Sequence, residues 1–174
     1  MLWLKTLGIV MVMTGFGSWG LNQARRIRQR VEQLKNLRLA LNFLQKEITY
    51  IHTPLPQALK RTEQFSVYPV SVLFQEVACS LGERQGNTAR EAWRKGMHKL
   101  SSHSELSPAD LELLATLGYQ IGMSDASEQE RVLLMVQEEL KILEEEALKA
   151  CESGQKLWSY TGFVLGAVVV LLLI

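Results

Sequence analysis

An uncharged apolar run constrains this chain more than any other feature of its sequence. Residues 157–174 contain no charged side chain, and Trp158 and Tyr160 stand near the start of the run. A helix over these residues is about 27 Å long, close to the thickness of the hydrocarbon core of a bilayer. Aromatic rings are favoured at the level of the lipid headgroups. The run therefore predicts a transmembrane helix at residues 157–174.

A second uncharged run, at residues 6–21, has two interpretations. It is either a secretory signal with small residues at a cleavage site, or an uncleaved anchor. The cations that follow favour the anchor, because a dense basic segment resists translocation and stays cytoplasmic. These topology residues are Arg25, Arg26, Arg28 and Arg30. We therefore expect transmembrane helices at 1–21 and 157–174, a cytoplasmic domain at 22–156, both termini outside and a location in the cell membrane.

Two long apolar stripes inside the domain have the three- and four-residue spacing of helices. The first consists of Val31, Leu34, Leu37, Leu41, Leu44, Ile48 and Ile51. The second consists of Leu133, Val136, Leu140, Leu143, Ala147, Ala150 and Gly154. We expect the helix with the second stripe to continue into the C-terminal anchor with little or no break.

Turn and capping signals between the two stripes predict shorter helices. Pro54 and Pro56 end the first long helix, because a residue before proline is disfavoured in the helical region. A short helix over 56–64 follows. Ser107-Pro108 starts a later helix, and Thr-x-x-Glu or Ser-x-x-Glu capping boxes begin two others, at 88–91 and 127–130. The fold class is therefore all-α: a cytoplasmic helical bundle of about six helices between N- and C-terminal transmembrane helices.

The bases of the two long helices carry opposite charge. Cations predominate at 25–38, whereas Glu144, Glu145 and Glu146 stand in the last helix. One hypothesis is that these charges pair across the seam between the two helices. The alternative is that the arginines only set topology and contact anionic lipid, with the glutamates solvated.

No reactive constellation is visible in the sequence. Phosphate-binding glycine motifs are absent, the three histidines have no metal-ligand spacing, and the arginine-rich segment lacks interleaved aromatics for nucleic acid. Cys79 and Cys151 show no Cys-x-x-Cys pattern, and we expect both to be small buried residues in a reducing compartment. We therefore expect no catalytic, metal or cofactor-binding residues, no enzyme activity and no nucleic-acid partner.

Three sequence motifs resemble one known family, the stage III sporulation protein AB family of endospore-forming bacteria. The first motif, at 44–59, contains Glu47, Tyr50, Thr53, Pro54 and Pro56. The second, at 88–93, contains Glu91 and Trp93. The third, at 117–129, contains Gly118, Gly122, Ser124, Asp125 and Gln129. Gly96 departs from the family pattern, where a better helix former is expected.

The resemblance implies a bundle similar to the soluble domain of the F-type inner-membrane platform protein of type II secretion and type IV pilus systems. It implies a non-enzymatic platform subunit in a complex between mother cell and forespore, in the mother-cell membrane around the forespore. The implied partners are a secretion-type ATPase and other membrane subunits of the complex. Membrane lipid and further copies of the chain are also expected as partners. The alternative is a membrane-tethered regulatory adaptor that sequesters a cytoplasmic partner.

Several motif residues have both a structural and a partner-binding interpretation. Glu47 either bridges or caps a neighbouring helix, or contacts a partner. Gly118 and Gly122 allow close backbone approach on one helix face, and Gly122 is equally suited to a C-cap. Asp125 either caps the last helix or presents its charge to a partner. Trp93 is expected in the core.

Overall fold

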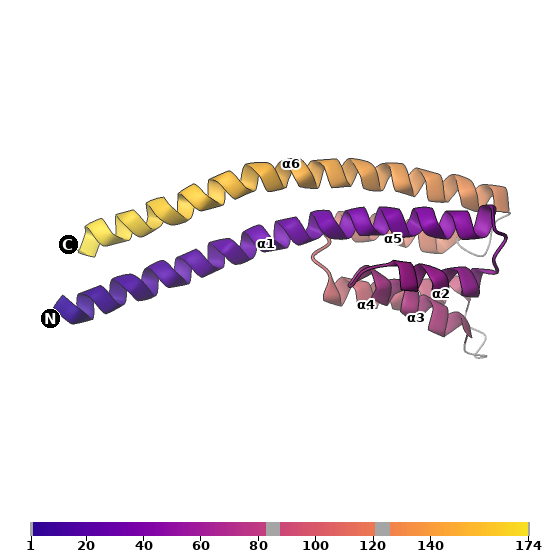
Figure 1. Ribbon diagram of the computed structural model, residues 1–174, viewed down its shortest axis with the longest axis horizontal. Coiled ribbons are helices and arrows are strands. Elements are labelled where there is room, and N and C mark those ends of the chain that lie inside the picture. Colours follow the sequence, from indigo (N-terminus) through magenta and orange to yellow (C-terminus); the bar gives the residue numbers. More distant parts are fainter. Residues whose placement is uncertain (1, 83–87, 121–125, 174) are drawn as a thin grey trace. The chain divides into compact units, whose positions relative to one another are not determined.

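The chain folds into helices joined by short connections. A computed structural model describes residues 2–82, 88–120 and 126–173, with residues 2–14, 16–21, 120, 126, 127, 129 and 155–173 described by their backbone alone. These ranges contain six helices and no strand (Figure 1). The helices are α1 (Leu2–Thr49), α2 (Leu55–Phe65), α3 (Val70–Gly82), α4 (Ala89–His103), α5 (Pro108–Gln120) and α6 (Ala126–Leu173). The all-α class is thus confirmed for the described residues.

The chain divides into two compact units, one of residues 1–29 with 146–174 and the other of residues 30–145. The second unit is the helical bundle and holds all the sites described below. α1 and α6 are each a single helix with residues in both units. The expectation that the last helix continues into the C-terminal run is therefore confirmed.

No helix in the described part of the chain is both long and apolar enough to qualify as a membrane span. The two predicted anchors, at 1–21 and 157–174, fall on residues whose side chains, apart from Gly15, lie outside the described set. Both anchors therefore stay predictions.

The apolar stripe of α1 forms the centre of the bundle. Leu34, Leu37, Leu41 and Leu44 are completely buried. Placing Ile51 in this stripe was wrong, because α1 ends at Thr49 and Ile51 is 57% exposed. Figure 1 shows α1 of the bundle between α6 on one side and α2, α3 and α4 on the other.

The helices α2, α3 and α4 pack together through α3. Phe74 of α3 and Trp93 of α4 meet edge to face, with ring centroids 6.3 Å apart. α4 continues through Gly96, which is buried, and a Cβ there would lie 2.9 Å from the Leu73 carbonyl oxygen. Glycine at 96, unexpected from the family pattern, thus lets α4 approach the backbone of α3 closely. Cys79 of α3 is exposed, so the expectation that it is buried was wrong.

The seam between α1 and α6 contains polar side chains among its apolar contacts. Asn42 donates from Nδ2 to Oε1 of Gln137 at 3.1 Å, and Gln137 donates from Nε2 to Oε1 of Gln45 at 2.8 Å. Arg38 donates to Glu144 at 2.9 Å. Charge pairing across this seam is therefore confirmed for Arg38 and Glu144.

On α6, most of the predicted stripe is buried. Its buried members are Leu133, Val136, Leu140 and Ala147. Ala150, which the same spacing placed in the stripe, is exposed.

Candidate functional site

The turn between α1 and α2 is organised around the carboxylate of Glu47. Glu47 is 4% exposed, and its Oε2 accepts hydrogen bonds from Thr53 Oγ1 at 2.8 Å and Arg61 Nη1 at 2.9 Å. An ion pair with a buried carboxylate is stronger than a solvated one, since less water competes for it. Glu47 thus bridges the last turn of α1 to α2, and contact of Glu47 with a partner stays a prediction.

Backbone hydrogen bonds close the same turn tightly. The amide groups of Tyr50 and Ile51 donate to the Lys46 carbonyl at 3.0 and 3.2 Å, and the Thr53 amide donates to Glu47 at 2.9 Å. His52 has a φ of 57°, in the left-handed region that few non-glycine residues occupy. Pro54 precedes α2, and its carbonyl accepts the amide groups of Gln57 and Ala58.

This turn presents apolar side chains to solvent. Tyr50 is 72% exposed and Ile51 is 57% exposed, and His52 beside them is also exposed. We name residues 50–52 the tip. Because the Glu47 contacts and the closed backbone fix its conformation, the tip is suited to binding a partner surface with little loss of conformational entropy.

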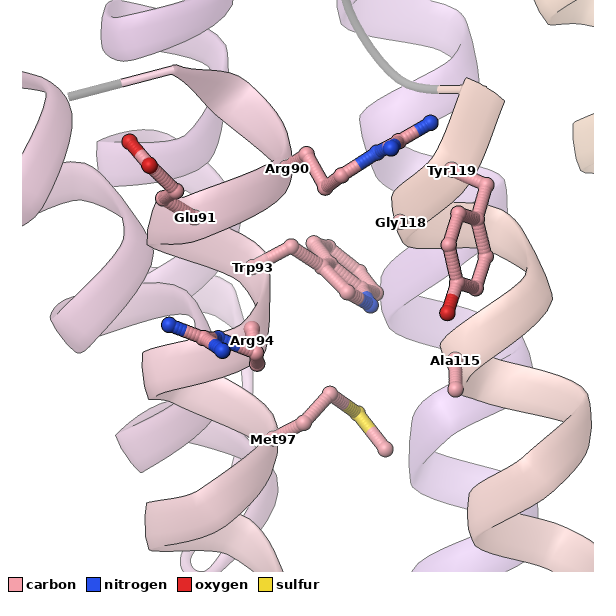
Figure 2. A pocket seen from close by; sticks show the side chains of 8 residues that line it. All are labelled: Arg90, Glu91, Trp93, Arg94, Met97, Ala115, Gly118 and Tyr119. Atoms are coloured by element: carbon pink, nitrogen blue, oxygen red, sulfur yellow. The ribbon is translucent and has the colours of Figure 1, made fainter.

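A groove of about 380 Å³ lies between α4 and α5. Its lining consists of Arg90, Glu91, Trp93, Arg94, Met97, Ala115, Gly118 and Tyr119. Figure 2 shows Arg90, Trp93 and Met97 extending from α4 toward α5, where Gly118, Tyr119 and Ala115 lie. We name this feature the α4/α5 groove.

The floor of the α4/α5 groove is the indole of Trp93. Trp93 is 1% exposed, and its Nε1 donates to the carbonyl oxygen of Leu114 at 2.9 Å. A Cβ on Gly118 would lie 2.8 Å from Cγ of this indole. Trp93 is therefore in the core as predicted, and Gly118 allows the close approach expected of it.

Two further groups define the rim of the groove. The guanidinium of Arg90 lies 4.8 Å from the ring centroid of Tyr119 in a cation–π contact. Glu91 completes the predicted capping box, accepting from the Thr88 amide at 3.1 Å while the Glu91 amide donates to Thr88 Oγ1 at 3.3 Å. The hydrogen bonds from the backbone and then the side chain of Thr88 lower the pKa of Glu91 below its ordinary value.

The ion pair between Asp110 and Arg30 was not predicted from the sequence. Asp110 of α5, completely buried, accepts two hydrogen bonds from Arg30 of α1 and one from the amide of Ser107. The sequence suggested Arg30 only as a topology residue, and Ser107-Pro108 only as the start of a helix. No sequence signal relates two positions so far apart, because their contact depends on how α5 packs on α1.

Comparison with known proteins matches these features to one family. A family model described as stage III sporulation protein AB matches residues 5–174. The chain belongs to the stage III sporulation protein AB family. Stage III sporulation protein AB of Bacillus subtilis (strain 168) is 29% identical over 170 residues, which is 98% of this chain and 99% of that protein. A solved structure of stage III sporulation protein AB covers 71% of this chain and 97% of that chain, with a TM-score of 0.66 and 29% identity.

The three motifs that suggested the stage III sporulation protein AB family meet at two places in the described bundle. The first motif forms the tip and its Glu47 support, with Pro54 and Pro56 at the start of α2. The second and third motifs meet in the α4/α5 groove, through Glu91, Trp93 and Gly118. Gly122, Ser124 and Asp125 lie outside the described residues, as does the side chain of Gln129.

These places in the family member are suited to binding. Among the described residues, no group of three or more His, Cys, Asp or Glu side chains could hold a metal ion. The tip exposes an aromatic and an aliphatic side chain, and the groove combines apolar lining with guanidinium groups. Aromatic, methionine and arginine side chains are the types enriched at protein interfaces.

Proposed function

We propose that this chain is a non-enzymatic, membrane-anchored platform subunit of a sporulation complex between mother cell and forespore. In this role it couples a cytoplasmic ATPase to membrane components of the complex. Membership of the stage III sporulation protein AB family supports the sporulation role. The uncharged runs at 6–21 and 157–174 support the membrane anchors and a cytoplasmic bundle.

The observation that carries the coupling role is the tip. Tyr50 and Ile51 are exposed, yet the turn that presents them is held by the Glu47 contacts to Thr53 and Arg61. The tip directly follows α1, a single helix from Leu2 to Thr49. A partner that binds the tip therefore acts on α1 with no flexible segment between.

The experiment places a crosslinking group at the tip in sporulating cells. The full chain carries Ile51→Cys in a background with Cys79→Ser and Cys151→Ser. A cysteine-directed crosslinker is expected to capture a hexameric ATPase. The matched control is Gln64→Cys, which is exposed on α2 away from the tip. Capture by the control at the same yield would contradict docking at the tip.

A second variant separates docking from folding. Tyr50→Ala, added to the chain that carries Ile51→Cys, removes the exposed aromatic side chain but leaves the Glu47 network in place. We expect ATPase capture from position 51 to fall by about tenfold or more, the effect of losing an interface anchor. The thermal midpoint of the helical signal should be unchanged. Capture of only a transcription factor or kinase at the tip would instead support the regulatory adaptor.

The membrane orientation has its own test. A cysteine at the exposed position 64 (Gln64→Cys) in the cysteine-free chain should react with a membrane-permeant reagent in intact cells. It should not react with an impermeant one. Labelling by the impermeant reagent would place the bundle outside and overturn the coupling to a cytoplasmic ATPase.

A further inference from the structure

The solvent-exposed side of α6 in the bundle carries both large apolar side chains and carboxylates. Leu134, Met135 and Ile142 are 49%, 54% and 57% exposed. Glu138 and Glu145 are exposed between and after them, and all five lie opposite the buried side of the helix. We name these five residues the α6 face. An isolated surface leucine is ordinary, but three large apolar side chains at helical spacing form a patch.

The α4/α5 groove is complementary to this face in its chemistry. Arg90 and Arg94 stand one helical turn apart on its rim, and Met97 and Tyr119 line it with apolar surface. α4 carries four Lys and Arg residues against one carboxylate, whereas residues 126–145 of α6 carry six carboxylates against two cations. Guanidinium groups bind carboxylates well, because their parallel N–H groups match both oxygens.

The two surfaces also match in length. Met135 and Ile142 are seven residues apart on α6, or about 10 Å along a helix. Arg90 and Met97, at the two ends of the α4 rim, have the same separation in sequence. Glu138 lies between the two apolar residues of α6, just as Arg94 lies between Arg90 and Met97.

We propose that the occupant of the α4/α5 groove is a second copy of this chain, which inserts its α6 face. Met135 and Ile142 of one copy contact the apolar lining around Met97 and Tyr119 of the next. The carboxylates of the α6 face meet the arginines of the groove. This contact goes beyond the proposed function, since it concerns copies of the chain alone and needs no ATPase.

The contact is heterologous, because a groove on one copy receives a helix face on the next. Each copy in contact keeps one groove and one face for further copies. Such interfaces produce rings where the rotation closes, and linear arrays where it does not. The proposal therefore assigns the bundle a means of building a multi-copy assembly.

Charge reversal tests the pairing with the full chain in detergent micelles. The groove-reversed variant carries Arg90→Glu and Arg94→Glu. The face-reversed variant carries Glu138→Arg and Glu145→Arg. We expect native mass spectrometry to show multi-copy assemblies of the unaltered chain, and a dissociation constant raised by about tenfold or more in each variant alone.

Mixing the two variants is the decisive step. Groove-reversed copies repel one another, and so do face-reversed copies, but each kind complements the other. A one-to-one mixture is therefore expected to recover assemblies in which the two variants alternate. Circular dichroism should show the same helical content for all chains. An unaltered chain that is monomeric at micromolar concentration, or a mixture that fails to assemble, would overturn the proposal.

Crosslinking identifies the contact directly. Two differently tagged copies, both with Cys79→Ser and Cys151→Ser, carry Glu138→Cys and Arg94→Cys respectively. Oxidation is expected to join the two tags in one disulfide-linked species. A Gln64→Cys copy in place of the Arg94→Cys copy is the control and should give none. If the cysteine at position 94 forms disulfides only with other proteins, or with none, the occupant is not a second copy.

Discussion

Arg30 of α1 and Asp110 of α5 form a two-point ion pair across the bundle. The Nε of Arg30 donates to Oδ2 of Asp110 at 2.7 Å, and Nη2 donates to Oδ1 at 2.9 Å. The side chain of Asp110 is 0% exposed and that of Arg30 is 26% exposed. A buried carboxylate depends on such a partner, because its charge has lost the stabilisation that water provides.

The ion pair makes stability depend on acid pH. Burial raises the pKa of Asp110, but the hydrogen bonds from Arg30 and Ser107 and the Arg30 charge outweigh it and leave the pKa below the ordinary 3.8. A depressed pKa contributes stability above that ordinary value, and this contribution is lost as pH falls through the folded-state pKa. The free energy of unfolding from urea titrations should therefore decrease below about pH 4.

Asp110→Asn is the matched variant for this pH dependence. We expect it to lower the free energy of unfolding at neutral pH by about 3 kcal/mol, since it leaves Arg30 without its carboxylate. It should also flatten the decrease at acid pH. An equally steep acid decrease in the variant would show that other carboxylates cause it.

Gly118→Ala should destabilise the bundle. The new Cβ would lie 2.8 Å from Cγ of the Trp93 indole, which is buried and held by its hydrogen bond to Leu114. Overpacking of this kind costs about 1–3 kcal/mol. Gly82→Ala is the control, because nothing lies within 4 Å of a Cβ at that position. Thermal unfolding should show a lower midpoint for Gly118→Ala alone.

The backbone of His52 predicts opposite results for two substitutions. With a φ of 57°, residue 52 occupies a region open to glycine but strongly disfavoured for β-branched side chains. His52→Val should lower the free energy of unfolding by about 1–3 kcal/mol. His52→Gly should leave it unchanged or raised, although both variants lose the imidazole. If both variants are destabilised equally, the cause is the loss of the imidazole ring and not the backbone conformation of residue 52.

The link between Glu47 and Arg61 can be measured by a double-mutant cycle. Glu47→Ala, Arg61→Ala and the double variant should give a coupling energy of about 1 kcal/mol. The pair is 2.9 Å long, and the Glu47 carboxylate is nearly buried. Lys60→Ala, on the adjacent exposed position, combined with Glu47→Ala should give no coupling. Additive effects of the first two changes would show that the turn does not depend on their contact.

Charge exchange tests the seam between α1 and α6. Glu144→Lys should lower the thermal midpoint, because a cation then faces Arg38, whose side chain is 33% exposed. The effect is small, about 0.5–1 kcal/mol, as for other partly exposed pairs. Combining Arg38→Glu with Glu144→Lys should restore the thermal midpoint. Combining Arg38→Glu with Glu139→Lys is the control and should not restore it. Failure of the first rescue would contradict pairing across the seam.

The sequence predicted the helices better than it predicted their contacts. Apolar spacing identified the buried side of α1, and the proline turn and the capping box of α4 were found where the structure has them. These signals are local, since they depend on residues within one or two turns. The same spacing extended the stripe too far, to Ile51 and Ala150, because periodicity alone does not say where burial ends.

The candidate site was predictable only in its parts. Trp93 and Gly118 were identified separately, but no pattern in the sequence indicated that a glycine on α5 would face that indole. The buried amides of Gln45 and Gln137 were missed altogether. In a sequence, a polar residue within an apolar stripe is ordinarily interpreted as an interruption of the stripe. Its hydrogen-bond partner lies on another helix and is known only once the two helices are packed together.

The hydrogen-bonded amides of Asn42, Gln137 and Gln45 determine how α1 and α6 are aligned along their length. A slip of one helix past the other by a single turn, about 5.4 Å, would separate all three groups and leave buried amides without partners. Two helices that meet only through aliphatic side chains have many alignments of nearly equal energy. Between α1 and α6, only one alignment lets the buried amides form their hydrogen bonds. The two helices are therefore expected to move as one rigid body. A force applied to either helix should be transmitted to the other.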